Sequence, residues 1–164
     1  MPVPASIFPP RREAALERLR TFLPDAAQRY ASQRNADLGP EARSGVSQLS
    51  PYVRYRLVTE AEIVTQVLAR HSFSAAEKYV QEVLWRTYWK GWLEQRPAAW
   101  TRWTEAVPRL RDGLRGERRS AWEAAITGRT GIAGFDDWAR ELVATGYLHN
   151  HARMWFASIW IFTL

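Results

Sequence analysis

Apolar residues recur every three or four positions along most of the chain, which is the spacing of one face of an α-helix. After the paired prolines at positions 9 and 10, for example, Ala15, Leu19 and Phe22 share such a face. No stretch alternates apolar and polar residues for long enough to indicate a strand. The sequence therefore predicts an all-α fold, a multi-helix bundle. Further helices are predicted over residues 25–34, 118–127 and 135–144, and onward from Ser50, Thr59, Ser74 and Tyr147.

Three of these helices begin with residues that are typical of helix starts. Ser50 followed by Pro51 indicates an N-cap with proline at the first helical position. Thr59 and Ser74 each precede a glutamate by three residues, which is the spacing of a capping box. The box at Ser74 is expected to begin a long helix that runs to about Gln95.

Other segments interrupt the pattern. Residues 35–47 contain glycine, serine and proline and predict a loop, and residues 97–118, with prolines at 97 and 108, predict a less regular segment. The apolar run at residues 154–164 ends without a helix-stop signal. A helix that is apolar around most of its circumference needs partners on several sides, so we expect further chain or a partner surface to cover it.

The composition narrows the class of protein. A length of 164 residues fits one domain, and we expect a single partial domain over residues 1–164, with leading helices and a loop up to residue 44. The absence of cysteine excludes disulfides, thiolate metal ligands and cysteine nucleophiles. The longest apolar run is too short to cross a bilayer, and the amino terminus lacks the apolar core of a signal peptide. The sequence therefore predicts a cytoplasmic protein without a membrane partner.

Charge and tryptophan content suggest what the protein binds. A net charge of +6 favours polyanions such as nucleic acid, although a composition bias toward arginine would produce the same charge. The nine tryptophans are either core residues or rings that stack on nucleobases or on a flavin.

Two groups of residues could form a binding site. Ser47 and Ser50 bracket a predicted helix start, where free N–H groups and hydroxyls suit a phosphate, although a plain N-cap has the same sequence. On the long helix, Tyr79, Glu82, Trp85 and Arg86 cluster on one side. Two rings, an anion and a cation suggest a pocket, whereas core packing and an intrahelical Glu82–Arg86 pair are the alternatives.

The segment TGYLHNHARM at residues 145–154 contains two histidines. In a helix His149 and His151 would lie roughly 200° apart around the axis, so they cannot readily hold one ion, and no metal site is predicted. His149 and Arg153 share one face, and Asn150 and Met154 share another.

Three motifs follow one another along the chain: Y-x-x-x-R…S-x-L-S-P-Y, E-x-x-W-R-x-Y and TG…TG-Y-x-H-N-x-x-R-M. In this order they resemble the FAD-binding helical domain of the DNA photolyase/cryptochrome family. The resemblance covers roughly residues 10–164. It implies a non-covalent FAD folded into a U shape within a helical bundle. The cofactor-contacting positions of the family then correspond to Tyr30, Ser47, Gln48, Leu49, Ser50, Tyr79, Arg86 and Arg153, and the lesion-contacting positions to Glu82, Trp85, Asn150 and Met154.

The resemblance also implies a partner and a reaction. The partner is DNA that carries UV photoproducts, and the reaction is blue-light-driven splitting of a flipped-out pyrimidine dimer by an electron from reduced FAD. Glu82 would contact the damaged pyrimidines and Trp85 would stack beneath them. A blue-light sensor without repair activity, or a flavin-free helical module that binds nucleic acid, are the alternatives.

Several positions depart from the family pattern. Val46 stands where a threonine is frequent, Gln48 where an arginine is frequent, and Ala125 where many members carry a surface tryptophan. The chain also lacks the amino-terminal antenna domain and the downstream segment with the acidic partner expected for Arg153. We therefore expect the missing part of its own domain to be a partner, and we expect this chain alone to retain FAD weakly and to be too short for activity.

Overall fold

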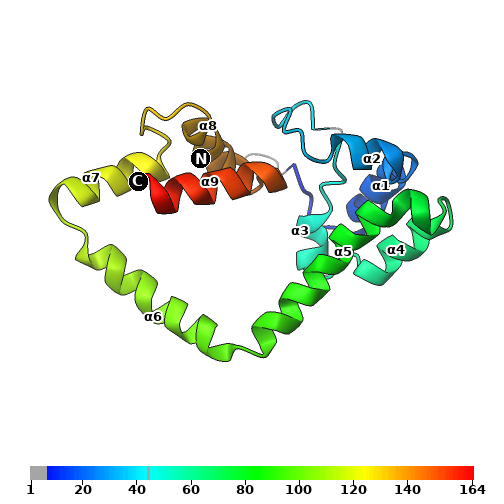
Figure 1. The fold of residues 1–164 in the computed structure, drawn as a ribbon, viewed down its shortest axis with the longest axis horizontal. Helices are drawn as coiled ribbons and strands as arrows, with labels where there is room; N and C mark the ends of the chain where they lie inside the picture. The colour runs from blue at the N-terminus through cyan, green and yellow to red at the C-terminus, as the bar shows by residue number, and fades with distance from the viewer. Residues whose placement is uncertain (1–6, 44) are drawn as a thin grey trace. The chain divides into compact units, whose positions relative to one another are not determined.

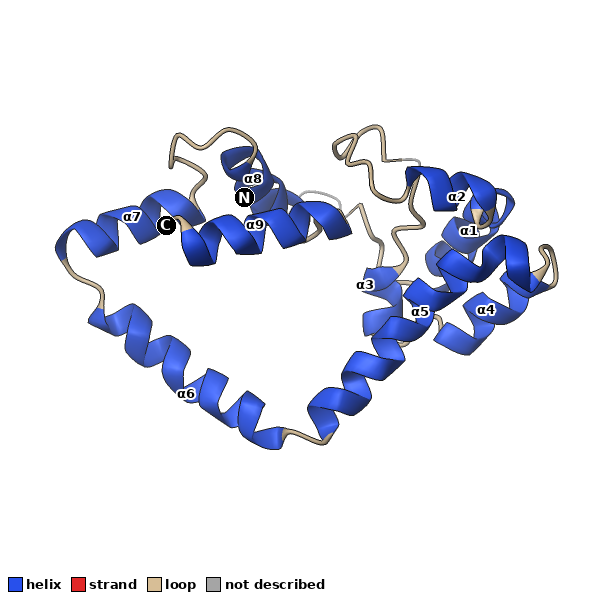
Figure 2. Cartoon of the chain, in the orientation of Figure 1, coloured by secondary structure: helices blue, strands red, loops and turns tan. Residues whose placement is uncertain are grey.

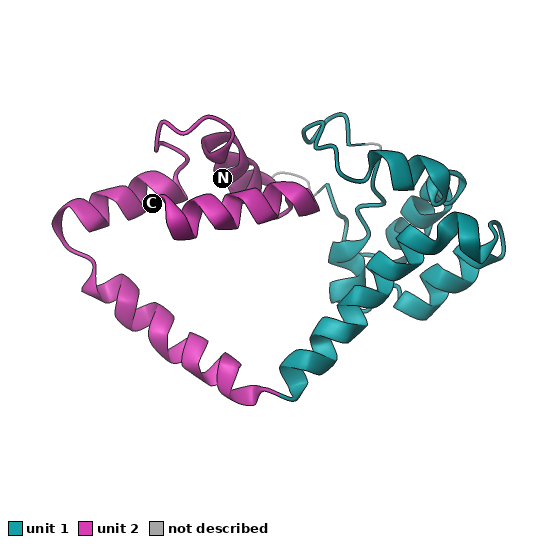
Figure 3. Cartoon of the chain, in the orientation of Figure 1, with its two compact units in different colours: residues 1–95 teal, residues 96–164 magenta. Residues whose placement is uncertain are grey.

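The computed structural model describes residues 7–43 and 45–164, and within these ranges every regular element is helical (Figures 1 and 2). This confirms the predicted all-α fold. The chain divides into two compact units, residues 1–95 and 96–164 (Figure 3). None of the described helices is long and apolar enough to cross a membrane. The expectation of one partial domain over residues 1–164 stays a prediction.

The first unit consists of short helices packed around the start of one long helix. Its core is formed by side chains such as Leu19, Ile63 and Val67, which are at most 1% exposed. Helices α4 and α2 both pack against α5, and the buried residues of α5, Ala76, Tyr79 and Val80, all lie in its first half. In chain order the elements are α1 (Arg12–Phe22), the 3-10 helix η1 (Leu23–Asp25), α2 (Gln28–Gln33), α3 (Ser50–Arg54), α4 (Glu60–Leu68) and α5 (Phe73–Glu94).

The predicted helix starts are partly correct. The capping box at Thr59 is confirmed, since its hydroxyl accepts from the Glu62 N–H while the Glu62 carboxylate accepts from the Thr59 N–H. The box predicted at Ser74 is wrong: the backbone is still extended at Ser72, whose hydroxyl accepts from the Ala75 N–H, so Ser74 already lies inside α5. Helix α3 begins at Ser50 itself and has Leu49 at the N-cap position, one residue earlier than predicted.

The second unit contains α6 (Pro97–Gly113), α7 (Gly116–Ile126), α8 (Phe135–Thr145) and α9 (Asn150–Phe162). The prediction of an irregular segment at 97–118 is wrong. Pro97 occupies the first turn of α6, where no N–H is needed, and Pro108 removes only one hydrogen bond from the helix interior. None of the described α6 residues is buried. The core of this unit is smaller and centres on Phe135, whose ring stacks on Phe156 at 4.6 Å.

The loop before α8 is held by one carboxylate. Asp136 accepts hydrogen bonds from the Thr130 N–H, the Thr130 hydroxyl and the Gly131 N–H. Burial raises the pKa of Asp136, but these hydrogen bonds and the charge of Arg140 outweigh it and lower the pKa below its usual value. Gly128 completes the loop with φ +63°, and a Cβ at this position would lie 2.5 Å from the Asp136 carbonyl oxygen.

Candidate functional site

Two predicted cofactor-contacting tyrosines lie side by side in the core of the first unit. Tyr79 of α5 is 4% exposed, and its ring meets that of Tyr30 of α2 edge to face at 4.9 Å. Phe22 packs against both rings. Burial raises the pKa of the Tyr79 hydroxyl well above its ordinary value, while the adjacent Ser47 hydroxyl lowers it by a smaller amount. The phenol is therefore neutral, so its buried hydroxyl can donate a hydrogen bond.

Glu82 is held by an arginine to which the sequence analysis gave no role. The Arg34 Nη1 lies 2.7 Å from the Glu82 Oε1, and the two side chains are only 26% and 33% exposed. The contact joins the residue that follows α2 to α5 across 48 sequence positions. The Y-x-x-x-R motif includes Arg34, so the motif contained the signal, but no local spacing could pair this arginine with Glu82. The ion pair fixes the direction of a carboxylate that remains partly accessible.

Trp85 follows Glu82 by one turn of α5 and is 48% exposed. Its ring meets Tyr88 edge to face at 5.2 Å and stacks on Trp89 at 6.5 Å. These neighbours limit the rotation of the indole while leaving much of it accessible. This helix face was expected to be either the wall of a pocket or part of the core. The accessible Trp85 and Glu82 fit a pocket wall, whereas the buried Tyr79 fits core packing.

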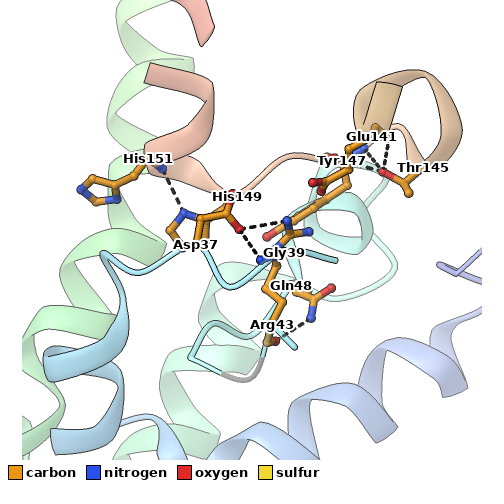
Figure 4. Close-up of polar contacts among 9 residues, drawn as sticks. All are labelled: Asp37, Gly39, Arg43, Gln48, Glu141, Thr145, Tyr147, His149 and His151. Atoms are coloured by element: carbon orange, nitrogen blue, oxygen red, sulfur yellow. Dashed lines mark hydrogen bonds and ion pairs between the residues drawn. The ribbon is translucent and has the colours of Figure 1, made fainter. Parts of the chain in front are cut away.

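The segment from Ser47 to Ser50 leads into α3. Leu49 is buried in the core, and Gln48 has a left-handed backbone with φ +52°. The Gln48 side-chain amide donates to the Arg43 carbonyl at 3.0 Å (Figure 4). The Ser50 carbonyl accepts from the Arg86 Nη2 at 3.2 Å, which ties α5 to the start of α3. The Glu82 carboxylate pairs with Arg34, which lies 48 positions away in the sequence.

The loop before this segment is anchored by a buried ion pair that sequence reasoning missed. Arg43 Nη2 lies 3.1 Å from Asp37 Oδ1, and the arginine side chain is 2% exposed. The same carboxylate accepts from the Gly39 N–H (Figure 4). A cavity of about 550 Å³ beside it is lined in part by Arg43, Ser47 and Gln48. The ion pair thereby helps to hold the loop that carries two of the predicted phosphate-binding residues.

In the second unit, His149 caps α9. Its Nδ1 accepts from the His151 N–H at 3.3 Å, and its side chain is buried (Figure 4). The preceding turn is closed by Thr145, whose hydroxyl donates to the Glu141 carbonyl and accepts from the Tyr147 N–H (Figure 4). The helix therefore starts at Asn150 rather than near Tyr147, because Gly146 first ends α8 in a left-handed conformation.

The predicted residues of α9 lie in its first two turns. Asn150, Arg153 and Met154 are exposed, with Met154 62% accessible. The Asn150 Oδ1 accepts from the Arg153 Nη2 at 3.2 Å. Each unit thus brings some of the predicted residues together. In the first unit Tyr30 and Tyr79 lie beside Ser47, Glu82 contacts Arg34, and Arg86 contacts Ser50. In the second unit Asn150 contacts Arg153.

Comparison with known proteins gives consistent matches. A family model described as the FAD binding domain of DNA photolyase matches residues 79–164. The deoxyribodipyrimidine photo-lyase of Thermus thermophilus is 34% identical over 151 residues, which cover 88% of this chain and 33% of that protein. The mitochondrial deoxyribodipyrimidine photo-lyase of Saccharomyces cerevisiae is 30% identical over 160 residues, 89% of this chain and 27% of that protein.

A solved structure is also similar. The crystal structure of a bacterial class III photolyase from Agrobacterium tumefaciens matches with a TM-score of 0.74 and 25% identity, over 94% of this chain and 32% of that one. Fold and sequence together define the class as a helical domain of the FAD-binding type. The chain belongs to the family of FAD-binding domains of DNA photolyase, which confirms the predicted family and FAD as the cofactor of that family. It spans about a third of the length of the curated relatives that it matches.

Proposed function

We propose that this chain contributes one part of the cofactor and lesion site of a DNA photolyase, an enzyme that repairs pyrimidine dimers with blue light. The cofactor would be FAD and the substrate DNA with a dimerised pyrimidine pair. Residues proposed to contact FAD are Tyr30, Ser47, Gln48, Leu49, Ser50, Tyr79, Arg86 and Arg153, and those proposed to contact the lesion are Glu82, Trp85, Asn150 and Met154.

The observation that carries the proposal is the pairing of Glu82 and Trp85 on α5. A carboxylate held in one direction by Arg34 lies one helical turn from a half-exposed indole. A flipped-out base is recognised in general by hydrogen bonds to its edge and by stacking on a ring. These two side chains offer one group of each kind, and they lie within the segment that matches the photolyase domain.

The residues proposed to hold FAD have suitable chemistry. Ser47 and Ser50 carry hydroxyls, and the segment from Ser47 to Ser50 contains no carboxylate that would repel a phosphate. The neutral Tyr79 phenol lies beside Ser47. Arg86, tied to the Ser50 carbonyl, adds positive charge. When bound, FAD supplies the light-driven electron transfer, and the protein supplies position and electrostatics.

The protein groups would then act by binding and orientation. The Glu82 carboxylate accepts hydrogen bonds from the N–H edges of the pyrimidines, and Arg34 holds it in one direction. Trp85 replaces the stacking that a base loses when it leaves the duplex. The Asn150 amide, oriented by Arg153, offers a further donor and acceptor. None of these steps requires a protein nucleophile.

Because the chain is proposed to supply only one part of the site, the test is repair by the full-length protein, purified and loaded with reduced FAD. A thymine-dimer oligonucleotide is irradiated with blue light, and a dark sample is the control. Recovery of intact thymines in the irradiated sample only is the expected result. Bound flavin without repair would contradict the proposal and favour a light sensor, while DNA binding without any flavin would favour a flavin-free nucleic-acid module.

A further inference from the structure

A second group of charged side chains lies on the first unit, beside the end of α3 and the second half of α5. It surrounds a cavity of about 360 Å³, which we call the basic cavity. All of its lining residues belong to residues 1–95, so the cavity is formed within one unit. The residues that line it are Val53, Arg54, Tyr55, Glu60, Arg86 and Lys90.

The carboxylate among these residues, Glu60, is neutralised by an arginine outside the lining. Arg56 Nη1 lies 2.7 Å from Glu60 Oε2, and the Glu60 side chain is 10% exposed. Arg56 has φ +60°, in the turn that ends α3. A side chain in this left-handed region is strained, and glycine is the usual residue there. An arginine at this strained position supplies a partner for Glu60, which a glycine could not.

With Glu60 paired, the remaining lining charges are cationic. The Arg86 guanidinium donates to the Ser50 carbonyl, which fixes its position beside the cavity. Lys90 follows Arg86 by one helical turn, and Arg54 lies across from them on α3. Cations that converge from two helices on a partly enclosed volume favour an oxyanion with several acceptor oxygens, such as a phosphate.

An aromatic ring at the same place narrows the ligand further. Tyr55 is 73% exposed, and the Arg54 guanidinium lies over its ring at 5.9 Å. Exposed rings interleaved with cations are the pattern by which proteins bind single-stranded nucleic acid, because bases stack on the rings while the cations hold the backbone. A free inorganic phosphate would make no use of the ring.

We propose that the basic cavity binds one phosphodiester group of single-stranded nucleic acid, with an adjacent base stacked on Tyr55. Arg54 and Lys90 would contact the phosphate beside Arg86, and the Arg56–Glu60 pair would keep the site cationic. This contact is independent of base sequence and of damage. It requires neither light nor the lesion contacts of Glu82 and Trp85, so its failure and the failure of the repair proposal can be told apart.

The test measures binding of an undamaged, mixed-sequence single-stranded oligonucleotide by fluorescence anisotropy in the dark, at several salt concentrations. The variant is Arg54→Ala with Lys90→Ala. The matched control, Arg70→Ala with Lys78→Ala, removes the same charge from exposed positions of the same unit outside the cavity. We expect the variant to lose about tenfold in affinity or more and the slope of log K against log salt to fall by about 1. Tyr55→Ala is expected to weaken binding about 5- to 100-fold and Tyr55→Phe to preserve it.

Several outcomes would overturn the proposal. Equal losses in the cavity variant and the matched control would show an effect of net charge alone. Full competition by inorganic phosphate together with wild-type affinity for Tyr55→Ala would indicate a simple oxyanion site. Loss of FAD retention with unchanged oligonucleotide affinity would assign the cavity to the cofactor phosphates. Circular dichroism melts confirm that each variant is folded, and Arg54→Gln with Lys90→Gln, which retains more of each side chain, replaces any variant that is not.

Discussion

At the scale of single residues, partners distant in sequence decide what a charged side chain can do. Glu77 and Glu82 lie on the same helix but have different partners. Glu82 pairs with Arg34, whereas Glu77 accepts a hydrogen bond from the side-chain amide of Gln81. Only Glu82 combines a fixed direction with a neighbouring indole. The two glutamates therefore form a matched pair for mutation.

We predict that Glu82→Ala lowers the affinity for a dimer-containing oligonucleotide by roughly 10- to 100-fold, the range for a hydrogen bond to a charged group. Binding in the dark, measured against the undamaged oligonucleotide, isolates recognition of the lesion. Arg34→Ala should weaken binding in the same direction but less, because the carboxylate stays in place without its partner. Glu77→Ala is the control, and an equal loss there would contradict the role given to Glu82.

A second residue-scale prediction concerns pH. Hydrogen bonds from Arg12, followed by those from Thr59, lower the pKa of Glu62 from 4.5 to about 2. Because the folded value lies below the unfolded one, the stabilisation is complete above about pH 4.5 and is lost as the pH falls toward 2. Melting temperatures of the wild type and of Glu62→Gln should therefore differ most above pH 4.5 and converge near pH 2. A difference that does not depend on pH would refute this account.

At the scale of elements, α6 shows how a helix can form against its local signals. It carries Pro108 in its interior and buries none of its described residues. Its exposed face displays Trp100 and Trp103, with rings 5.0 Å apart, followed by Val107 and Leu110. The periodic apolar positions were present in the sequence, but the prolines and arginines obscured them.

Pro108→Ala tests the energetic part of this account. A proline in a helix interior is less favourable than alanine by about 3 kcal/mol, so the variant should raise the helical content or the melting temperature of the second unit. Circular dichroism measures both quantities. Arg109→Ala is the control: Arg109 is an exposed neighbour that, unlike proline, keeps its backbone N–H, so this substitution should change little. A Pro108→Ala variant that is less stable than the wild type would contradict this account.

At the scale of the whole molecule, both units expose large apolar side chains. On α9 Trp155, Ile161 and Phe162 are 64%, 69% and 83% accessible, and on α5 Trp85 and Trp89 are about half exposed. Such exposure is unusual for a soluble domain and indicates surfaces that take part in further contacts. This agrees with the expectation that the final apolar helix needs partners on several sides.

We predict that the 164-residue chain self-associates as its concentration rises and binds an apolar dye. Ile161→Ser with Phe162→Ser should reduce both effects, because it makes the most exposed apolar end of α9 polar. Light scattering and dye fluorescence provide the measurements. Thr127→Ser, an exposed and already polar position, is the control. Unchanged association in the double variant would locate the contact surface elsewhere, on α5 or α6.

The sequence by itself determined the properties that depend on neighbouring residues. Helical periodicity predicted the all-α fold, and the Thr59 capping box formed as expected because its two partners are three residues apart. The order and spacing of the motifs were enough to indicate the family. The helix starts near Ser74 and Tyr147 were misplaced by a few residues because the competing signals, an extended Ser72 and a left-handed Gly146, are equally local.

Only the tertiary structure decided which distant side chains meet. The Arg34–Glu82 pair, the Arg86 contact with the Ser50 carbonyl and the basic cavity each require separate helices to pack together. Such contacts depend on the directions of helix faces in space, which periodicity does not encode. The sequence could therefore name the residues of the proposed site, whereas the fold decided that Tyr79 is buried, that Glu82 is held in one direction and that Trp85 remains accessible.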